Sequence, residues 1–438
     1  MDITTRIRIK KPSIKYSVLL AFATCGCVIG GTYSSLLSYA ALALSVVAIV
    51  FLSEEDSICL LMLLMPFANI FKASPTSQSF FTYLILFYVL WYLFKKRQIN
   101  APFLLHFVLL LVFLVAQMLM SMHILRTVKF VANILLIYLV VNGSTLKDNK
   151  RIYLYYIFGM IISSAVVAFG VIPNLESYVG TKDLGYDYEK LARFAGLYGD
   201  PNYYSVNIII SLCLVVTLHH KKQLGTVLAL LFAAVLVTFA IMTYSKSAFL
   251  MLLLPLLMLL YSQICSRKYF VFVVLSLAAV VLVSSVLAGR IEAFNTVLSR
   301  LLGDDGGSLT TGRDVLWANY IGYIGKSWWT AIVGGGFNAP LIGKHAAHNT
   351  YIDLIYYLGI VGTVLLGGTF YAIIKLTPAP LKRNLLNYSV FLCVMAMYFF
   401  LSELFYFDWA FHIIIAILVL KTNMNQNLGG GKCEKVSV

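Results

Sequence analysis

Charged residues are scarce in this chain. Only 12% of its 438 residues are Asp, Glu, Lys or Arg, against about a quarter in an average soluble domain. Hydrophobic residues make up 61%, and the mean hydropathy is +0.87. Apolar runs of roughly 16–20 residues recur along the whole length, and each is about long enough to cross the hydrocarbon core of a bilayer. This composition excludes an ordinary soluble domain and predicts an all-α, polytopic membrane protein built as one helical bundle.

Three other features are missing. The N-terminus is basic, but no small-residue cleavage site follows its first apolar run, so we expect that run to stay as a helix. The seven cysteines form no disulfide framework, and Cys25 and Cys27 are interpreted as small apolar fillers of a helix rather than metal ligands. No internal repeat is visible, which disfavours a carrier built from repeated halves.

Positive charge is present in excess, and its placement is informative. The net charge is +15, but the basic residues cluster in short loops between apolar runs, as orientation signals do. This pattern argues against a nucleic-acid partner and puts the N-terminus in the cytoplasm. In the resulting topology the inner segments hold 21 Lys and Arg against 6 Asp and Glu, whereas the outer segments hold 12 of each kind.

The hydropathy pattern predicts fourteen helices, or twelve full spans if one tightly turning pair is re-entrant. The chain divides into N-terminal helices over 1–172, a first outer loop over 173–200, helices over 201–288, a large outer loop over 289–347, helices over 348–421 and a cytoplasmic tail over 422–438. The predicted helices are 16–33, 36–52, 57–71, 79–94, 102–120, 124–142, 152–172, 201–218, 223–243, 247–264, 269–288, 348–375, 386–402 and 405–421.

The large outer loop has the composition of a partly helical segment. Apolar residues between 290 and 301 share one helical face. Thr311 and Asp314 have the spacing of a capping box. An apolar stripe follows that suits a helix lying in the membrane interface, and it consists of Trp317, Ile321, Ile324 and Trp328. We therefore expect this loop to fold onto the membrane surface.

The first outer loop ends on a group of polar residues at the start of a helix. Asp200 followed by proline is a typical helix start, so capping is the simplest interpretation of Asp200, with Asn202 close behind. Arg193 could hold a phosphate with its planar, two-pronged guanidinium. The alternative for Arg193 is an interfacial side chain that extends its charge into water.

Further cations are expected at the same outer surface. Lys246 lies in a short turn between two apolar runs, where a lysine alone is usually an anchor. Arg313 begins the second loop helix, and Lys344 follows in the large loop. Several cations with few acids at a helical mouth suit an anionic, membrane-bound ligand, for which a lipid pyrophosphate is the natural candidate.

A histidine stands at the junction between the large loop and the next helix. His348, followed by Asn349, could act as a general base on a hydroxyl or as a proton relay; a hydrogen-bonded interfacial histidine is the alternative. His345 completes an H-x-x-H pair, which is a weak metal site without a third ligand, and only Asp353 is near in sequence. We expect no metal and no cofactor.

Taken in order, these motifs resemble the superfamily of O-antigen ligases and Wzy-type polysaccharide polymerases, which are bacterial membrane glycosyltransferases with a C-type fold. The resemblance covers residues 193–362. Its motifs are R-F-A-G-x-x-x-D-P-N at 193–202, S-K-S at 245–247, G-R-D-x-L-W at 312–317, G-G-G-F at 334–337, H-N-T-Y at 348–351 and G-x-x-G at 359–362. The N-terminal helices are similar to the family only in being apolar.

The resemblance implies roles for individual residues. The family's two pyrophosphate-binding arginines would fall on Arg193 and Lys246, with Arg313 as a third cation, and its essential histidine on His348. Lysine departs from the family pattern because it keeps the charge but not the planar fork. A D-x-D motif in the first outer turn, usual in metal-dependent members of the wider fold class, is absent.

The implied activity is transfer of a glycan from undecaprenyl pyrophosphate to an acceptor, without metal and with inversion, at the outer face of the bacterial cytoplasmic membrane. We favour a polymerase of oligosaccharide repeat units, whose partners would be the lipid-linked donor, a glycan or lipid acceptor, membrane lipids, a flippase and a chain-length regulator. Ligase-type transfer to a lipid acceptor is the alternative. A flippase or other carrier should place cations at mid-helix, and a scaffold would not explain the polar set.

Overall fold

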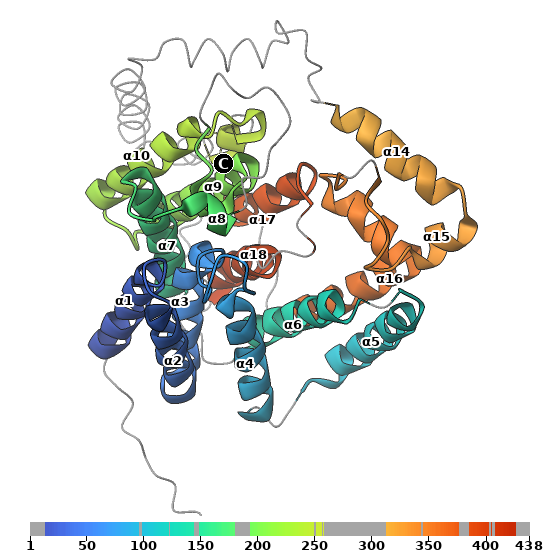
Figure 1. The fold of residues 1–438 in the computed structure, drawn as a ribbon, viewed down its shortest axis with the longest axis horizontal. Helices are drawn as coiled ribbons and strands as arrows, with labels where there is room; N and C mark the ends of the chain where they lie inside the picture. Colours follow the sequence, from blue (N-terminus) through green and yellow to red (C-terminus); the bar gives the residue numbers. More distant parts are fainter. Residues whose placement is uncertain are drawn as a thin grey trace, which may run out of the picture.

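The described part of the computed structural model is all helical (Figure 1). It covers residues 14–95, 99–121, 123–143, 149–179, 193–248, 251–255, 257, 312–342, 345–375, 385–402, 404 and 408–425, and it contains no strand. The first half contributes α1 (Ile14–Gly30), α2 (Ser35–Phe51), α3 (Glu54–Leu64), α4 (Phe80–Lys95), α5 (Ala101–Ser121), α6 (Ile124–Val141), α7 (Lys150–Ala168) and α8 (Leu175–Val179). The second half contributes α9 (Pro201–His220), α10 (Thr226–Met242), α14 (Arg313–Gly325), α15 (Trp328–Val333), α16 (Thr350–Lys375), α17 (Leu385–Tyr398) and α18 (Asp408–Asn425).

Several of these helices are suited to a membrane. Five of them, α5, α6, α7, α9 and α16, are long and apolar enough to cross one, and α1, α2, α4, α10 and α18 are shorter apolar helices. This finding supports a helical membrane protein. The predicted helix at 269–288 and most of the one at 247–264 lie outside the described residues.

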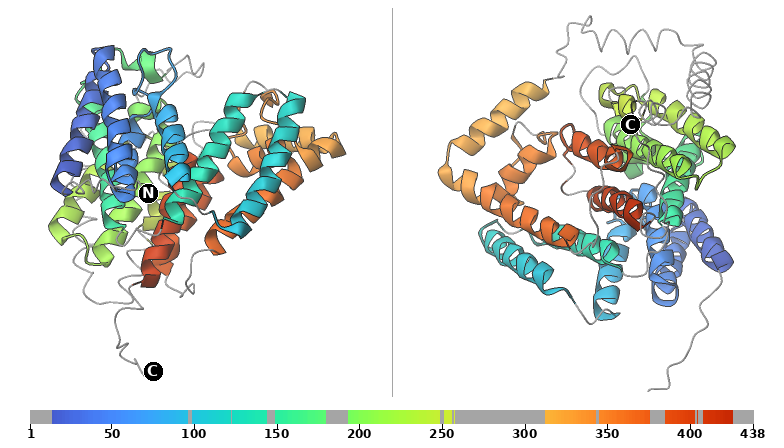
Figure 2. Two further views of the ribbon diagram at one scale, coloured as in Figure 1. Left: turned by 90° about the horizontal axis from the view of Figure 1, so that it is seen from below. Right: turned by 180° about the vertical axis from the view of Figure 1, so that it is seen from behind.

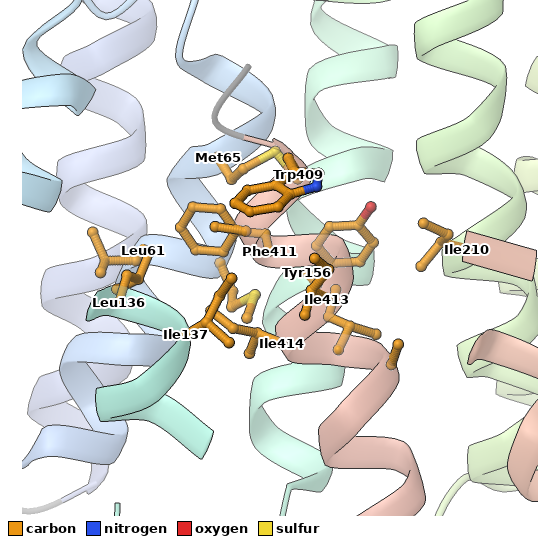
Figure 3. Packing of buried hydrophobic residues seen from close by; sticks show 14 of the residues in the cluster. Leu61, Met65, Leu136, Ile137, Tyr156, Ile210, Trp409, Phe411, Ile413 and Ile414 are labelled. Atoms are coloured by element: carbon orange, nitrogen blue, oxygen red, sulfur yellow. The ribbon is translucent and has the colours of Figure 1, made fainter. Parts of the chain in front are cut away.

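Helix α9 is the most deeply buried of the five candidate membrane spans. Its residues from Tyr203 to Leu218 are buried on every side, as expected for a helix that is apolar all round. It packs against α7, α10 and α17. Figure 3 shows Tyr156 of α7 next to Ile413 of α18 in the packed core, with Ile210 of α9 farther to the side.

One buried polar network ties three of these helices together. Asn207 Oδ1 accepts from the Tyr156 hydroxyl and from His412 Nε2, both at 2.8 Å. Asn207 Nδ2 donates to the Tyr203 carbonyl at 3.0 Å and to Asp408 Oδ2 at 3.4 Å. Buried polar side chains that satisfy one another hold membrane helices in register, so this network fixes α9 against α7 and α18.

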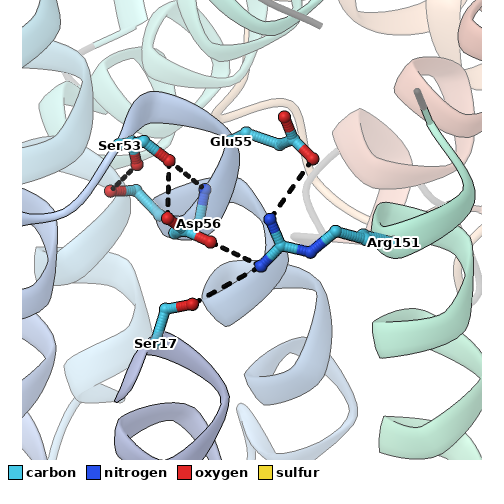
Figure 4. A network of polar contacts seen from close by, with 6 residues as sticks. Ser17, Ser53, Glu55, Asp56 and Arg151 are labelled. Carbon is cyan, nitrogen blue, oxygen red and sulfur yellow. Dashed lines mark hydrogen bonds and ion pairs between the residues drawn. The ribbon is translucent and has the colours of Figure 1, made fainter. Parts of the chain in front are cut away.

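A charged cluster lies at the starts of α3 and α7 and reaches Ser17 of α1 (Figure 4). Arg151 Nη2 lies 2.5 Å from Asp56 Oδ1, and its Nη1 lies 3.5 Å from Glu55 Oε1. Asp56 also accepts from the Ser53 hydroxyl at 2.6 Å, and the Ser53 oxygen caps α3 through the Asp56 amide. The opposite charges of these side chains pair with one another, so we interpret the cluster as a structural contact between helices.

The predicted helix 57–71 is wrong at its C-terminal end. Helix α3 stops at Leu64 and a 3₁₀ turn over Met65–Phe67, which contains a proline, replaces the last turns. The chain then turns toward the first polar loop: Asn69 Nδ2 donates to the Leu197 carbonyl and Lys72 Nζ to the Tyr178 carbonyl. Pro66 has no backbone N–H with which to continue the helix, so α3 ends just before it. The contacts to the distant loop then direct the chain beyond the turn.

The unbroken helix predicted over 348–375 is also wrong, because α16 breaks at Gly359 (φ 64°, ψ −175°). The break frees the carbonyls of Tyr356 and Tyr357, which accept from the amides of Gly335 and Gly336 at 2.8 and 3.0 Å. Freed backbone groups at membrane depth must find partners within the protein. A Cβ on Gly359 would come within 2.4 Å of the Gly334 amide nitrogen, so the glycines permit this close backbone contact.

The residues of the apolar stripe predicted for the large loop face in two different directions. Trp317 Nε1 donates to the Ala347 carbonyl at 2.9 Å and its ring packs on Phe399, so Trp317 faces inward. Ile321 and Trp328 are 59% and 71% exposed. Helix α14 ends at Gly325, which places Trp328 on the separate helix α15, whereas Ile321 lies on α14 itself and is exposed there. Gly312 is the N-cap residue of α14, whereas Thr311 of the predicted capping box lies outside the described residues.

Candidate functional site

Polar side chains gather where α9 begins and α10 ends. Arg193 Nε donates to the Thr243 carbonyl at 3.0 Å, and its Nη2 lies 3.4 Å from Asn202 Oδ1. The Ser245 hydroxyl donates to the same Asn202 oxygen at 2.7 Å. Two loops that are far apart in the sequence therefore meet in one cluster, consisting of Arg193, Asn202, Thr243 and Ser245.

The start of α9 positions this cluster. Asp200 is the N-cap residue, with Oδ1 accepting from the Asn202 amide at 2.6 Å, and Pro201 occupies the first helical turn. The predicted capping role of Asp200 is confirmed. Gly199 before it has φ 72°, and a Cβ there would come within 2.6 Å of the Val179 carbonyl oxygen. This close contact between the backbones of Gly199 and Val179 fixes the loop where α9 begins, and with it the position of Asn202.

Lys246 adjoins this cluster in the sequence. It follows Ser245 directly and begins a short apolar helix over Lys246–Pro255. Tyr244, which precedes Ser245, has φ 47°, a left-handed conformation that turns the chain sharply. The Ser245 and Ser247 hydroxyls are 2.8 Å apart, so the side chains on both sides of the half-buried Lys246 point into one polar cluster.

His348 is held at a fixed junction. Its φ is 49°, which is uncommon for a residue with a Cβ and is often found at functional sites. Asn349 Oδ1 accepts from the amides of Tyr351 and Ile352 at 3.0 and 3.1 Å, so Asn349 caps α16. The Thr350 hydroxyl donates to the Leu401 carbonyl at 2.6 Å. Capping, rather than substrate contact, is the role that the structure gives to Asn349.

The charges around His348 come from three segments of the chain. Burial lowers the pKa of His348 below 6.5, and the positive charge of Arg313 lowers it further. The carboxylate of Asp200 acts in the opposite direction, and His345 adds a small lowering effect. A histidine with a lowered pKa is neutral at pH 7 and can accept a proton. The charges that act on this imidazole therefore come from the start of α9, the start of α14 and the loop before α16.

The structure separates the other candidates. His345 is exposed, and its carbonyl accepts from the Tyr320 hydroxyl at 2.7 Å. Asp353 is 3% exposed within α16. The described residues contain no group of three or more His, Cys, Asp or Glu that could hold a metal ion. Lys344 lies outside the described residues.

Sequence reasoning missed two parts of this site. It gave no role to Ser245, which bonds to Asn202, or to the Thr243 carbonyl, which holds Arg193. The serines on both sides of Lys246 were the available signal. It also treated the three glycines at 334–336 as a motif only, although the amides of Gly335 and Gly336 donate to the carbonyls that the break in α16 frees.

The arrangement combines cations with a neutral, partly buried imidazole. Arginine and lysine bind phosphate oxygens, and a neutral imidazole can take a proton from a hydroxyl. Comparison with protein families, with characterised proteins and with solved structures found no match for this chain. Its likeness to the ligase and polymerase superfamily therefore depends on the motifs given above.

Proposed function

We propose that this protein is a membrane glycosyltransferase that moves a glycan from a polyprenyl-pyrophosphate carrier to a hydroxyl acceptor, as a polymerase of oligosaccharide repeat units. The main support is that His348 lies within the electrostatic reach of Asp200 and Arg313, while Asp200 is two residues from the Arg193 partner Asn202. A proton acceptor and an anion site are thus formed by adjoining parts of the fold.

The proposed reaction is a direct displacement. The acceptor oxygen attacks the anomeric carbon, and the bond from that carbon to the pyrophosphate oxygen breaks. Arg193 and Lys246, with Arg313 beside His348, stabilise the charge that develops on the departing lipid pyrophosphate. His348 takes the proton of the attacking hydroxyl. One displacement inverts the configuration at the anomeric carbon.

The polymerase and the ligase differ in their acceptor, and the residues of this site serve both. Transfer to a lipid acceptor uses the same cations and the same base. The site is proposed to face the outside of the bacterial cytoplasmic membrane, because the inner loops hold most of the basic residues. Cysteines introduced at Ser177 and Ser308 should react with an impermeant maleimide in intact cells; labelling at Thr145 instead would reverse this orientation.

The function is tested with purified protein in lipid nanodiscs and an undecaprenyl-pyrophosphate-linked oligosaccharide. The expected product is a longer glycan with release of undecaprenyl pyrophosphate, in the presence of excess EDTA. The His348→Ala variant should bind the donor as the wild type does but transfer it far more slowly. Loss of donor binding in His348→Ala, with transfer retained at saturating donor, would place the histidine in the pyrophosphate site and refute its role as base.

A further inference from the structure

A buried carboxyl group lies near the start of α16 without a cation from the protein beside it. Asp353 is 3% exposed, and α16 is one of the candidate membrane spans. Within the part of the chain that the structure describes, no lysine, arginine or histidine pairs with Asp353. Burying a carboxylate costs a large free energy unless an opposite charge or a proton compensates it. Asp353 therefore needs a positively charged partner or a proton.

A hydroxyl from the segment after α17 lies close to this carboxyl group. Ser402 is the side chain whose hydroxyl acts on Asp353, and it is buried as well. Neither Asp353 Oδ1 nor Ser402 Oγ, however, has a hydrogen-bond partner among the described residues. Buried polar atoms nearly always have partners in folded proteins. Two such oxygens close to one another therefore form a place where one small ligand can contact both.

Three segments of the chain hold these two oxygens in place. The Thr350 hydroxyl donates to the Leu401 carbonyl at 2.6 Å, and the Tyr203 hydroxyl of α9 donates to the Ser402 carbonyl at 2.7 Å. Residues three positions apart share one face of a helix, so Asp353 faces the same segment as Thr350. Figure 1 and the view from behind in Figure 2 show the end of α17 beside the start of α16. The site is thus built by α9, α16 and the segment that follows α17.

A proton alone does not account for both oxygens. A protonated carboxyl group needs an acceptor within hydrogen-bond distance, and Ser402 Oγ forms no hydrogen bond within the described residues. A water molecule would bridge the two oxygens but would leave the carboxylate charge uncompensated. A small cation would contact both oxygens and supply the positive charge that the burial of Asp353 requires. Broken membrane helices take part in sites for such ions, and α16 is broken at Gly359.

We propose that Asp353 and Ser402 bind one monovalent cation, Na⁺ or K⁺, at the start of α16. The inference does not depend on the proposed function. The cation would hold the first half of α16 against the segment that follows α17. Asn349, which caps α16, and His348 come directly before this contact, so cation binding would stabilise the junction that carries His348. EDTA does not sequester Na⁺ or K⁺, and the site is therefore compatible with glycan transfer in excess EDTA.

The test measures cation binding and thermal melting of the full-length protein in phosphatidylcholine nanodiscs. The wild type should bind about one equivalent of radiolabelled sodium or of rubidium, a tracer for potassium. It should also melt at a higher temperature in NaCl or KCl than in N-methyl-D-glucamine chloride of equal ionic strength, because a ligand that binds only the folded state stabilises it. Asp353→Asn should bind no cation and melt at the same temperature in all three salts. Ser402→Ala should weaken binding at least about tenfold.

Two matched controls use the same substitutions elsewhere in the fold. Glu176→Gln removes an exposed carboxylate on α8, and Ser211→Ala removes a buried hydroxyl that donates to the Asn207 carbonyl at 2.9 Å. Both variants should bind the cation as the wild type does. Because the amide of Asp353→Asn is uncharged, this variant should melt no lower than the wild type in N-methyl-D-glucamine chloride, a result that loss of a merely structural contact would not give.

Three results would overturn the inference. If the folded wild type binds neither sodium nor rubidium and melts at the same temperature in all three salts, Asp353 holds a proton instead. Binding that survives in both Asp353→Asn and Ser402→Ala would place the cation elsewhere in the protein. Stabilisation by MgCl₂ alone, removed by EDTA, would show a divalent site. If Asp353→Asn does not fold, cation binding by the wild type and its weakening in Ser402→Ala still decide the outcome.

Discussion

Two arginines at opposite ends of the bundle have different surroundings. Arg151 at the start of α7 forms ion pairs with Glu55 and Asp56 at 3.5 and 2.5 Å. Arg193, in the loop between α7 and α9, is held by the Thr243 carbonyl and the Asn202 amide oxygen. Carboxylates pair with the charge of a guanidinium, whereas a carbonyl and an amide oxygen accept its hydrogen bonds and orient it. The first arrangement is that of a structural contact; under the proposed function, the second would hold a cation in position for a ligand.

The same contrast applies to the starts of α3 and α9, which lie beside Arg151 and Arg193 respectively. Ser53 and Asp56 close the start of α3 within one turn. At the start of α9, Asp200 caps the helix, and its carboxylate also opposes the lowering of the His348 pKa. Asp200 thus has an electrostatic effect on a neighbouring histidine in addition to its role as a helix cap. Five predictions test whether the two ends differ as this comparison implies.

The largest effect is expected at His348. Replacing it by alanine should lower the turnover of lipid-linked oligosaccharide by roughly 10²–10⁴-fold, the usual scale for a lost general base, while donor binding and thermal stability stay near the wild type. The matched control is His345→Ala, because that side chain is exposed and should cost little. Equal losses in both variants would contradict the assignment of the base.

The next effect concerns Arg193. Arg193→Ala removes a charge-assisted contact to phosphate worth on the order of 1.5–3 kcal/mol, so donor affinity should fall by about 10–150-fold. Isothermal titration with undecaprenyl pyrophosphate measures the change. Unchanged affinity, together with a lower melting temperature, would place Arg193 with Arg151 among the structural residues and would break the comparison.

The opposite result is expected for the paired arginine. Arg151→Ala leaves Glu55 and Asp56 without their cation, and the bridge is only partly exposed, with 25% of the Arg151 side chain accessible. The free energy of unfolding should fall by about 2–3 kcal/mol, below the cost of breaking a fully buried pair. Thermal denaturation in detergent measures this loss. Donor affinity at the far end of the bundle should not change.

A smaller effect should appear in the pH dependence of transfer. The neutral form of His348 is the active one, so the rate should fall as the pH drops through its pKa, which lies below 6.5. Arg313→Gln removes a positive neighbour and should move this acid limb to higher pH. Asp200→Asn keeps the cap but removes a negative neighbour and should move the limb to lower pH. Profiles of kcat/KM that shift in the same direction would exclude this arrangement of charges.

The smallest effect is expected at Lys246. Lys246→Arg keeps the charge and adds the planar fork with which the resembling family would bind phosphate, so kcat/KM should stay within about threefold of the wild type. Lys246→Met, which removes the charge at similar length, is the contrasting variant and should weaken donor binding. If both variants are equally impaired, the position requires lysine for a packing reason rather than for its charge.

The sequence was sufficient for features that depend on neighbouring residues. Apolar runs predicted the positions of most described helices to within a few residues, because the length of a helix follows from local hydropathy and from its end signals. Asp200 and Pro201 predicted the start of α9 in the same way. The candidate cations and His348 were also visible, since each interrupts an otherwise apolar chain.

Only the tertiary structure decided what depends on distant contacts. The path of the chain after α3 reflects the bonds of Asn69 and Lys72 to the first polar loop. The break in α16 exists because the Gly335 and Gly336 amides supply partners for the freed carbonyls. The cluster of Arg193 with Ser245 likewise joins residues about fifty positions apart. Backbone groups at membrane depth need partners wherever they can find them, and no local pattern of residues records which distant segment provides one.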